Sequence, residues 1–165
     1  MKKVDIKSFV EQIARITRER MLAGPVVSLD DIKKGAPKKR PPTLLVIEDD
    51  DIVRKSLKRI FEKTGYNVLA ACDGPELTEV LYDTAIDLIM LDVALPWIDG
   101  YELAQMIKEH KDLCSVPIVF ISGHNDQAAI KKGFKVGAHD YITKPFDIEK
   151  VKKTVDTLLK LNCGD

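Results

Sequence analysis

The chain has 165 residues, of which 45% are hydrophobic and 32% charged, with 26 basic residues against 26 acidic ones. This length is typical of one domain and the apolar share is enough for a buried core, which excludes a collagen, a mucin and a fully disordered chain. The sequence shows no signal-peptide pattern, no apolar run long enough to cross a membrane, and three widely spaced cysteines, so we expect a cytoplasmic protein without a disulfide framework.

The neutral total conceals two electrostatic halves. Residues 1–42 carry 11 Lys or Arg and 5 Asp or Glu, a net charge of +6, whereas residues 43–165 carry 15 and 21, a net charge of −6. Residues 33–42 are basic and rich in proline, a composition that favours extended and solvated backbone. We therefore expect a boundary near Pro42, between a basic N-terminal arm (1–42) and a domain that spans 43–162.

The arm begins with a helical pattern whose apolar positions are Ile6, Phe9, Val10, Ile13 and Ile16. Gly24-Pro25 is expected to end this helix, and Ser28 with Asp31 has the capping-box form of a second, shorter one. The favoured interpretation is that the apolar stripe packs on the main domain or on a second copy of the chain, which leaves a homodimer open. A nucleic-acid-binding arm and a helix lying on a membrane are less favoured, because the charge is modest and dispersed.

From Thr43 onward, short apolar runs alternate with amphipathic helical patterns. The runs predict strands at residues 44–47, 67–71, 87–91, 118–122 and 140–143. The patterns between and after them predict helices at residues 51–64, 75–83, 101–110, 126–136 and 148–161. This alternation predicts an α/β fold with a doubly wound, five-stranded parallel sheet covered on both faces. Such sheets bind ligands at the carboxyl ends of their strands.

Polar residues gather at those strand ends. Glu48 and Asp49 follow the first strand, Asp92 the third and Lys144 the fifth, while Ser122 closes the fourth. Oxygen ligands without His or Cys nearby suit a hard cation, and Mg²⁺ is the ordinary cytosolic choice. The pattern therefore indicates a site for a metal ion and a phosphate group.

Some polar residues at these strand ends also have a plainer structural interpretation. Asp50 or Asp51 can cap the following helix, and Lys144 alone can be a solvated surface lysine. A carboxylate at Asp92, between two apolar neighbours, is harder to explain in this way, because it is costly unless a cation or donors compensate it.

These residues lie in four segments, LLVIEDDDIVR, DLIMLDVALPWIDGYEL, PIVFISG and GAHDYITKPF. Asp92 follows Asp49 by 43 residues and precedes Ser122 by 30 and Lys144 by 52. Together the segments resemble the receiver domains of two-component response regulators of the chemotaxis-regulator type. The resemblance covers about three quarters of the chain and implies a flavodoxin-like receiver fold preceded by the helical arm.

The resemblance implies that Asp92 accepts a phosphoryl group from a sensor histidine kinase or a phosphotransfer protein. It also implies a Mg²⁺ site formed by Glu48, Asp49, Asp92 and the backbone carbonyl of Ala94, with Lys144 binding a phosphoryl oxygen after a cis bond to Pro145. Three carboxylates and one lysine leave the pocket at about −2, so we expect very slow phosphorylation without the metal.

The same resemblance implies that Ser122 and Tyr141 form a switch. Its output is the repacking of the face made by the last two predicted helices, 126–136 and 148–161, and the fifth predicted strand, 140–143, and this face controls a downstream protein. Ala94 and His124 lie at the pocket rim, where the resemblance implies an influence on phosphoryl-group lifetime. His124 is equally consistent with a plain surface histidine.

Two other functions stay open. A Mg²⁺-dependent phosphatase or phosphotransferase with Asp92 as nucleophile is disfavoured because position 94 is Ala, where many such enzymes have a second Asp. A receiver-like scaffold without phosphorylation is disfavoured by the complete pocket. We expect no enzyme activity beyond self-catalysed phosphoryl acceptance and hydrolysis, and neither a membrane nor nucleic acid as a direct partner. Four residues follow Leu161, so either a single-domain regulator or part of a longer chain is expected.

Overall fold

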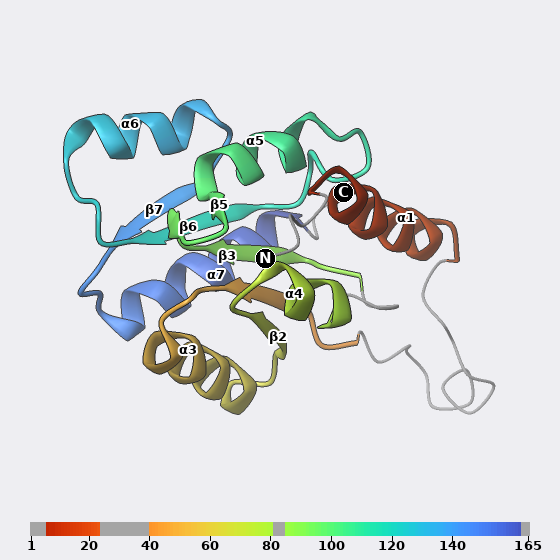
Figure 1. Cartoon of the computed structure of the whole chain (residues 1–165). Coiled ribbons are helices and arrows are strands. Elements are labelled where there is room, and N and C mark those ends of the chain that lie inside the picture. The colour runs from red at the N-terminus through yellow and green to blue at the C-terminus, as the bar shows by residue number, and fades with distance from the viewer. Residues whose placement is uncertain (1–5, 24–39, 81–84, 163–165) are drawn as a thin grey trace.

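The computed structural model describes residues 6–23, 40–80 and 85–162. Figure 1 shows a central sheet between two layers of helices, with one further helix at its side. The strands pair in the order β2-β1-β3-β6-β7 and every pair is parallel. Their bounds are β1 Thr43–Ile47, β2 Asn67–Ala71, β3 Leu88–Leu91, β6 Ile118–Ser122 and β7 Asp140–Thr143. The predicted doubly wound α/β fold with a five-stranded parallel sheet is confirmed.

The helices divide between the two faces of the sheet. Helices α3 (Asp51–Lys63) and α7 (Ile148–Asn162) cover one face, and α4 (Gly74–Val80), α5 (Gly100–Glu109) and α6 (Gln127–Lys135) cover the other. Successive strand residues alternate between the faces, so Leu44 packs with the first pair of helices and Leu45 with the second set. Because both faces are covered, the strands β1, β3 and β6 at the centre of the sheet are fully buried and almost entirely apolar, as their sequences indicated.

Asp50 starts α3. Its side chain accepts hydrogen bonds from the backbone of Ile52 at 2.9 Å and Val53 at 3.1 Å, which satisfies donors that have no partner inside the helix. The capping interpretation therefore holds for Asp50, and it leaves Glu48 and Asp49 to be explained in another way.

A two-stranded antiparallel ribbon, β4 (Ala94–Leu95) and β5 (Ile98–Asp99), follows Asp92 and was not predicted. Strands of two residues are too short for an alternating pattern, so the sequence gives no signal for them. The ribbon leads directly into α5, whose first residue, Gly100, packs on the backbone of the pocket. A Cβ atom at Gly100 would lie 2.3 Å from the carbonyl oxygen of Asp92, so only glycine fits here.

Helix α1 (Ile6–Ala23) ends where the sequence predicted and packs beside α5 (Figure 1). Val10 and Ala14 are buried within the core cluster on that side of the sheet, and Arg18 forms an ion pair with Asp112. Val10, a residue of the predicted stripe, and its neighbour Ala14 therefore pack on the main domain, which is one of the two placements expected. The second helix expected from Ser28 lies outside the described residues, as does most of the proline-rich segment.

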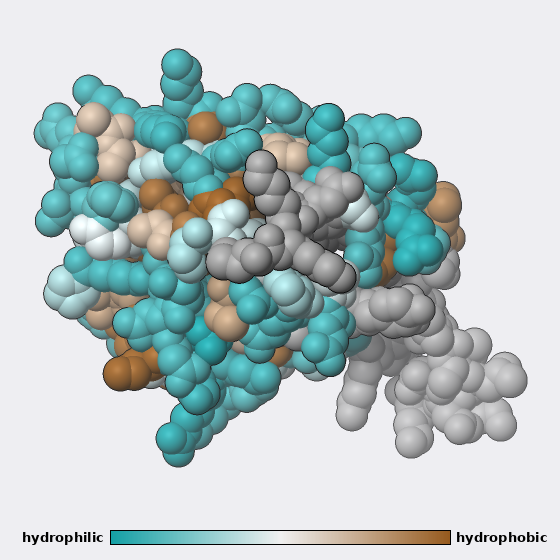
Figure 2. Space-filling view, in the orientation of Figure 1, coloured by the Kyte–Doolittle hydropathy of each residue, from teal (hydrophilic) through white to brown (hydrophobic). Residues whose placement is uncertain are grey.

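The face shown in Figure 2 is mostly hydrophilic, with apolar residues in small groups. Among the helices that the structure describes, none has the length and apolar character needed to span a bilayer. Cys72 and Cys114 are free thiols, and Cys163 lies outside the described residues.

Candidate functional site

The three acidic residues of the predicted site meet at the carboxyl edge of the sheet. Strands β1 and β3 are neighbours, with Ile47 opposite Leu91, and the backbone N–H of Asp92 donates to Ile47 O at 2.9 Å. Glu48, Asp49 and Asp92 each offer one oxygen, and these atoms lie within 4.8 Å of one another. Glu48 and Asp92 are buried whereas Asp49 is exposed, so the cluster opens to solvent on one side.

Lys144 reaches this cluster from the end of β7. Its Nζ lies 2.7 Å from Glu48 Oε2 and donates to Asp92 Oδ2 at 3.1 Å. The backbone N–H of Lys144 donates to Ser122 O at 2.7 Å, and the peptide bond to Pro145 is cis. With a side chain only 22% exposed between two carboxylates, Lys144 is not a solvated surface lysine.

The charges of the pocket do not balance. Burial raises the pKa of Glu48 to about 7, with a contribution from the charge of Asp92, although the bond to Lys144 opposes the rise. Burial alone would lower the pKa of Lys144, but hydrogen bonds and charges from Glu48 and Asp92 outweigh it and raise this pKa. One ammonium group is shared by two buried carboxylates, so the site lacks positive charge.

The donor set fits a hard divalent cation. Oxygen atoms of Glu48, Asp49 and Asp92 converge without a His or Cys among them. Among the described residues, Glu48 Oε2 is the one buried side-chain oxygen or nitrogen that accepts no well-formed hydrogen bond, despite its contact with Lys144 Nζ. A buried oxygen of this kind is costly unless a further cation or donor compensates it.

Arg54 supports the acidic pair, a role that the sequence analysis missed. Its Nη1 donates to the backbone carbonyls of Glu48 at 3.0 Å and Asp49 at 3.2 Å, and its Nη2 donates to Asp51 Oδ1 at 2.7 Å. These bonds hold the turn between β1 and α3, and none of them uses the carboxylate of Glu48 or Asp49. The only sequence signal is an arginine one turn into the helix, which is too common to assign a role.

The expected switch residues lie next to the pocket. Ser122 is buried at the end of β6, and its Oγ accepts from the backbone N–H of His124 at 3.1 Å. Tyr141 is 7% exposed, and its hydroxyl donates to His124 O at 2.9 Å. The side chain of His124 is exposed, and the backbone N–H of Ala94 donates to Asp92 Oδ1 at 3.3 Å. The structure thus brings the predicted metal, acceptor and rim residues to one edge of the sheet, and Tyr141, which lies within β7, reaches that edge through its hydroxyl bond to His124 O.

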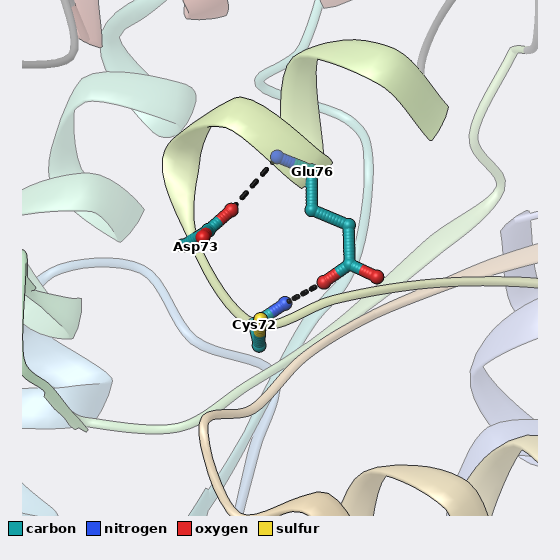
Figure 3. Close-up of side chains that lie close together, drawn as sticks. All are labelled: Cys72, Asp73 and Glu76. Carbon is teal, nitrogen blue, oxygen red and sulfur yellow. Dashed lines mark hydrogen bonds between the residues drawn. The ribbon is translucent and has the colours of Figure 1, made fainter.

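A second group of potential metal ligands lies where β2 meets α4 (Figure 3). Glu76 Oε2 accepts from the backbone N–H of Cys72 at 2.8 Å, and Asp73 Oδ1 accepts from that of Glu76 at 2.8 Å. These bonds cap the start of the helix. Hydrogen bonding to the Glu76 carboxylate, followed by burial, raises the pKa of the Cys72 thiol, which disfavours the thiolate that a metal requires.

The fold and the pocket define a class of protein: a doubly wound α/β domain with a carboxylate and lysine site at the topological switch point of its sheet. Residues 44–156 match the family model of the response regulator receiver domain, and the chain belongs to this family. The family resemblance of the sequence is therefore confirmed, and the protein is a receiver-domain protein of two-component signal transduction.

Curated relatives include the aerobic respiration control protein ArcA of Escherichia coli (strain K12), which is 38% identical over 125 residues, 74% of this chain and 51% of the relative. The transcriptional regulatory protein CrdR of Helicobacter pylori is 36% identical over 112 residues, 68% of this chain and 52% of that protein. The chain thus spans about half the length of the curated relatives it matches.

Solved structures agree with the family. A putative response regulator from Chloroflexus aurantiacus superposes with a TM-score of 0.67 at 35% identity, covering 73% of this chain and 98% of that one. The signal receiver domain of a histidine kinase from Syntrophus aciditrophicus gives a TM-score of 0.67 at 31% identity, covering 75% of this chain and 94% of that one. Family members are signalling proteins in general rather than enzymes acting on separate substrates.

Proposed function

We propose that this protein accepts a phosphoryl group on Asp92, in a Mg²⁺-dependent reaction, from a sensor histidine kinase or a phosphotransfer protein, and that the modification controls a downstream protein. The observation that carries the proposal is the buried Asp92 carboxylate, bonded to Lys144 Nζ at 3.1 Å, with carboxylate oxygens of Glu48 and Asp49 within 4.8 Å. This arrangement supplies a nucleophile, a phosphate-binding cation and a metal site together.

In the proposed reaction a carboxylate oxygen of Asp92 attacks the phosphorus of a phosphohistidine. The P–N bond breaks, its electron pair returns to the imidazole nitrogen, and an acyl phosphate forms on Asp92. Lys144, already held against Asp92, binds a phosphoryl oxygen and balances the negative charge that is brought in. Attack of water on the phosphorus later releases inorganic phosphate and restores the carboxylate.

Glu48, Asp49, Asp92 and the backbone carbonyl of Ala94 would hold the Mg²⁺. The ion, when bound, supplies charge neutralisation for the transferring phosphoryl group. Glu48 Oε2, buried and short of donors, supports its inclusion in this set. Arg54 positions the turn that carries Glu48 and Asp49 through their backbone carbonyls.

The proposed signal leaves the pocket through Ser122 and Tyr141. Ser122 lies at the end of β6, where its backbone carbonyl accepts from the backbone N–H of Lys144, and the bond from the backbone of His124 to its Oγ joins it to the loop before α6. A phosphoryl oxygen that takes Ser122 Oγ away from that bond repacks α6, β7 and α7, the surface that we propose contacts the downstream partner.

Intact-mass analysis after incubation with acetyl phosphate tests the proposal. We expect the wild type to gain one phosphoryl group with Mg²⁺ and none with a chelator, and Asp92→Asn to gain none in either case. Asp50→Asn is the matched control, since Asp50 is an exposed aspartate of the same acidic run that lies outside the cluster, and asparagine caps a helix as well as aspartate does; it should behave as the wild type.

Two results contradict the proposal. If the wild type gains no phosphoryl group under any condition, the protein is a receiver-like scaffold. If Asp92→Asn is modified as fully as the wild type, another residue is the acceptor and the role given to Asp92 is wrong.

A further inference from the structure

The Tyr141 ring is buried among residues of β6, α5 and α6, and we call this packing site, formed by Phe120, Tyr101 and Gly133, the seat of the ring. Phe120 of β6 packs against it with ring centroids 5.8 Å apart, and the Tyr101 ring of α5 packs edge-on against Phe120 at 5.2 Å. The hydroxyl oxygens of Tyr101 and Tyr141 are 3.3 Å apart. Tyr141 is therefore held by contacts that do not involve the Ser122 hydroxyl.

The third wall of the seat is α6, where Gly133 leaves room for the ring. A Cβ atom at this position would lie 2.7 Å from Tyr141 Cδ2 and 3.1 Å from Tyr141 Cε2. Contacts below 3.0 Å force a neighbour to move. A glycine inside a helix costs about 1 kcal/mol relative to alanine, and here it gives space for an inward tyrosine.

Tyr101 connects this seat to the backbone of the phospho-acceptor. It is the second residue of α5, and the first, Gly100, donates its N–H to Val93 O at 3.0 Å and packs against the Asp92 carbonyl. Lys132 of α6 lies 4.3 Å above the Tyr101 ring and 3.5 Å from Asp99 Oδ2. The Tyr101 side chain is thus fixed between α5 and α6 next to the pocket.

The hydroxyl groups form a short chain of hydrogen bonds. Tyr101 has one proton for two acceptors, Ala129 O at 3.1 Å and the Tyr141 oxygen at 3.3 Å, and Tyr141 donates its own proton to His124 O. Burial, followed by the bond with Tyr141, raises the pKa of Tyr101, so Tyr101 stays a donor at any physiological pH. Without this hydroxyl, the buried Tyr141 oxygen loses one of its two hydrogen-bond partners.

We propose that Tyr101 and Gly133 are positioning residues for Tyr141, one by hydrogen bonding and the other by leaving space, and that they hold it inward independently of Ser122. Helix α5 then forms a second connection between Asp92 and the α6-β7 surface. This inference rests on the proposed function, because it assigns the regulation of the same switch.

The orientation of Tyr141 is measured by NMR, from cross-relaxation between its ring protons and the α protons of residue 133 in protein with labelled tyrosine. We expect Tyr101→Phe to lower the ratio of inward to outward rotamers about fivefold, the loss expected for one hydrogen bond of typical net strength. Gly133→Ala should lower it at least as much, since the added methyl group occupies the ring's place. Tyr66→Phe is the matched control, because Tyr66 donates to Asp156 on the opposite face of the sheet and its loss should leave Tyr141 unchanged.

Beryllium fluoride with Mg²⁺, added as a phosphoryl mimic, distinguishes a failure of this inference from a failure of the proposed function. In Tyr101→Phe it should restore the inward rotamer through Ser122, whereas in the wild type Tyr141 should change little. An inward ratio in Tyr101→Phe and Gly133→Ala equal to that of the wild type overturns the inference, even if the mimic binds. A wild type that does not bind the mimic argues against the proposed function, and the rotamer ratios still decide the roles of Tyr101 and Gly133.

Discussion

Glu48 is a buried carboxyl group that shares its lysine with Asp92, and its pKa is raised to about 7 by burial. At a pH between 4.5, the ordinary pKa of a glutamate, and about 7, Glu48 keeps its proton in the folded protein, whereas the same group in the unfolded chain has released it. The free energy of unfolding should therefore fall as pH rises through this window, by at most about 3 kcal/mol. Urea unfolding at pH 5 and pH 8, with a chelator present, measures the difference.

Glu48→Gln should lack this part of the pH dependence, whereas Glu102→Gln, at an exposed position, should retain it. Parallel profiles for the wild type and Glu48→Gln would contradict the assignment. Saturating Mg²⁺ should also flatten the wild-type profile, because a bound cation favours the ionised carboxylate.

The small side chain of Ala94 leaves the rim of the pocket open to water. It is exposed beside Asp92, and it lines an open groove of about 610 Å³ together with His124 and Tyr101. We expect Ala94→Met to cover Asp92 and to lengthen the half-life of the acyl phosphate about twofold, a change of about 0.4 kcal/mol in the barrier. Loss of label from the phosphorylated protein gives the rate. His124→Ala tests the other side of the rim, and unchanged decay in both variants would show that neither residue controls water.

At the scale of elements, the junction between β5 and α5 requires glycine at position 100. A methyl group there would lie 2.3 Å from Asp92 O and 2.8 Å from Val93 Cα, both backbone atoms that cannot move independently. Gly100→Ala should lower the free energy of unfolding by about 1–3 kcal/mol, as overpacking does, and should slow phosphorylation of Asp92. Gly123→Ala is the control, because a Cβ atom at Gly123 meets nothing within 4 Å. Equal stability of the two variants would contradict the packing argument.

An apolar contact and the exposed ion pair between Arg18 and Asp112 join helix α1 to the rest of the domain. Ala14 is 1% exposed, so Ala14→Glu should release the helix, whereas Arg18→Ala should have little effect because surface ion pairs contribute little to stability. Amide hydrogen exchange is the measurement: exchange in residues 110–116 should increase in Ala14→Glu and stay near the wild-type rate in Glu11→Ala, an exposed position. Unchanged exchange in Ala14→Glu would mean that α1 does not cover this segment.

For the molecule as a whole, Mg²⁺ binding should raise the free energy of unfolding. A ligand that binds only the folded state raises the free energy of unfolding by about 2.7 kcal/mol at one hundred times its Kd. Mg²⁺ should therefore raise the Tm of the wild type, and a chelator should reverse the effect. Asp49→Asn should abolish most of the shift, while Asp50→Asn, which keeps the helix cap and lies outside the cluster, should keep it. An equal shift in all three proteins would place the ion elsewhere.

The elements of this molecule follow from local patterns. The apolar strands, the amphipathic helices and the glycine and proline that end α1 are properties of neighbouring residues, and they were predicted to within a few positions. The ribbon of β4 and β5 was missed, because two-residue strands have no periodicity. Arg54 was missed because its partners are backbone carbonyls, which every sequence provides.

The residues alone specify the order of strands and helices along the chain, the polar residues at the strand ends and, through the four segments that resemble receiver domains, the family. Which of these residues touch depends on the tertiary structure. Lys144 lies between two carboxylates that precede it by 96 and 52 residues, and the inward position of Tyr141 depends on Tyr101 and Gly133, which belong to two different helices. Such contacts are fixed by how elements pack across the sheet, and packing depends on the shapes of all neighbours at once rather than on any local pattern.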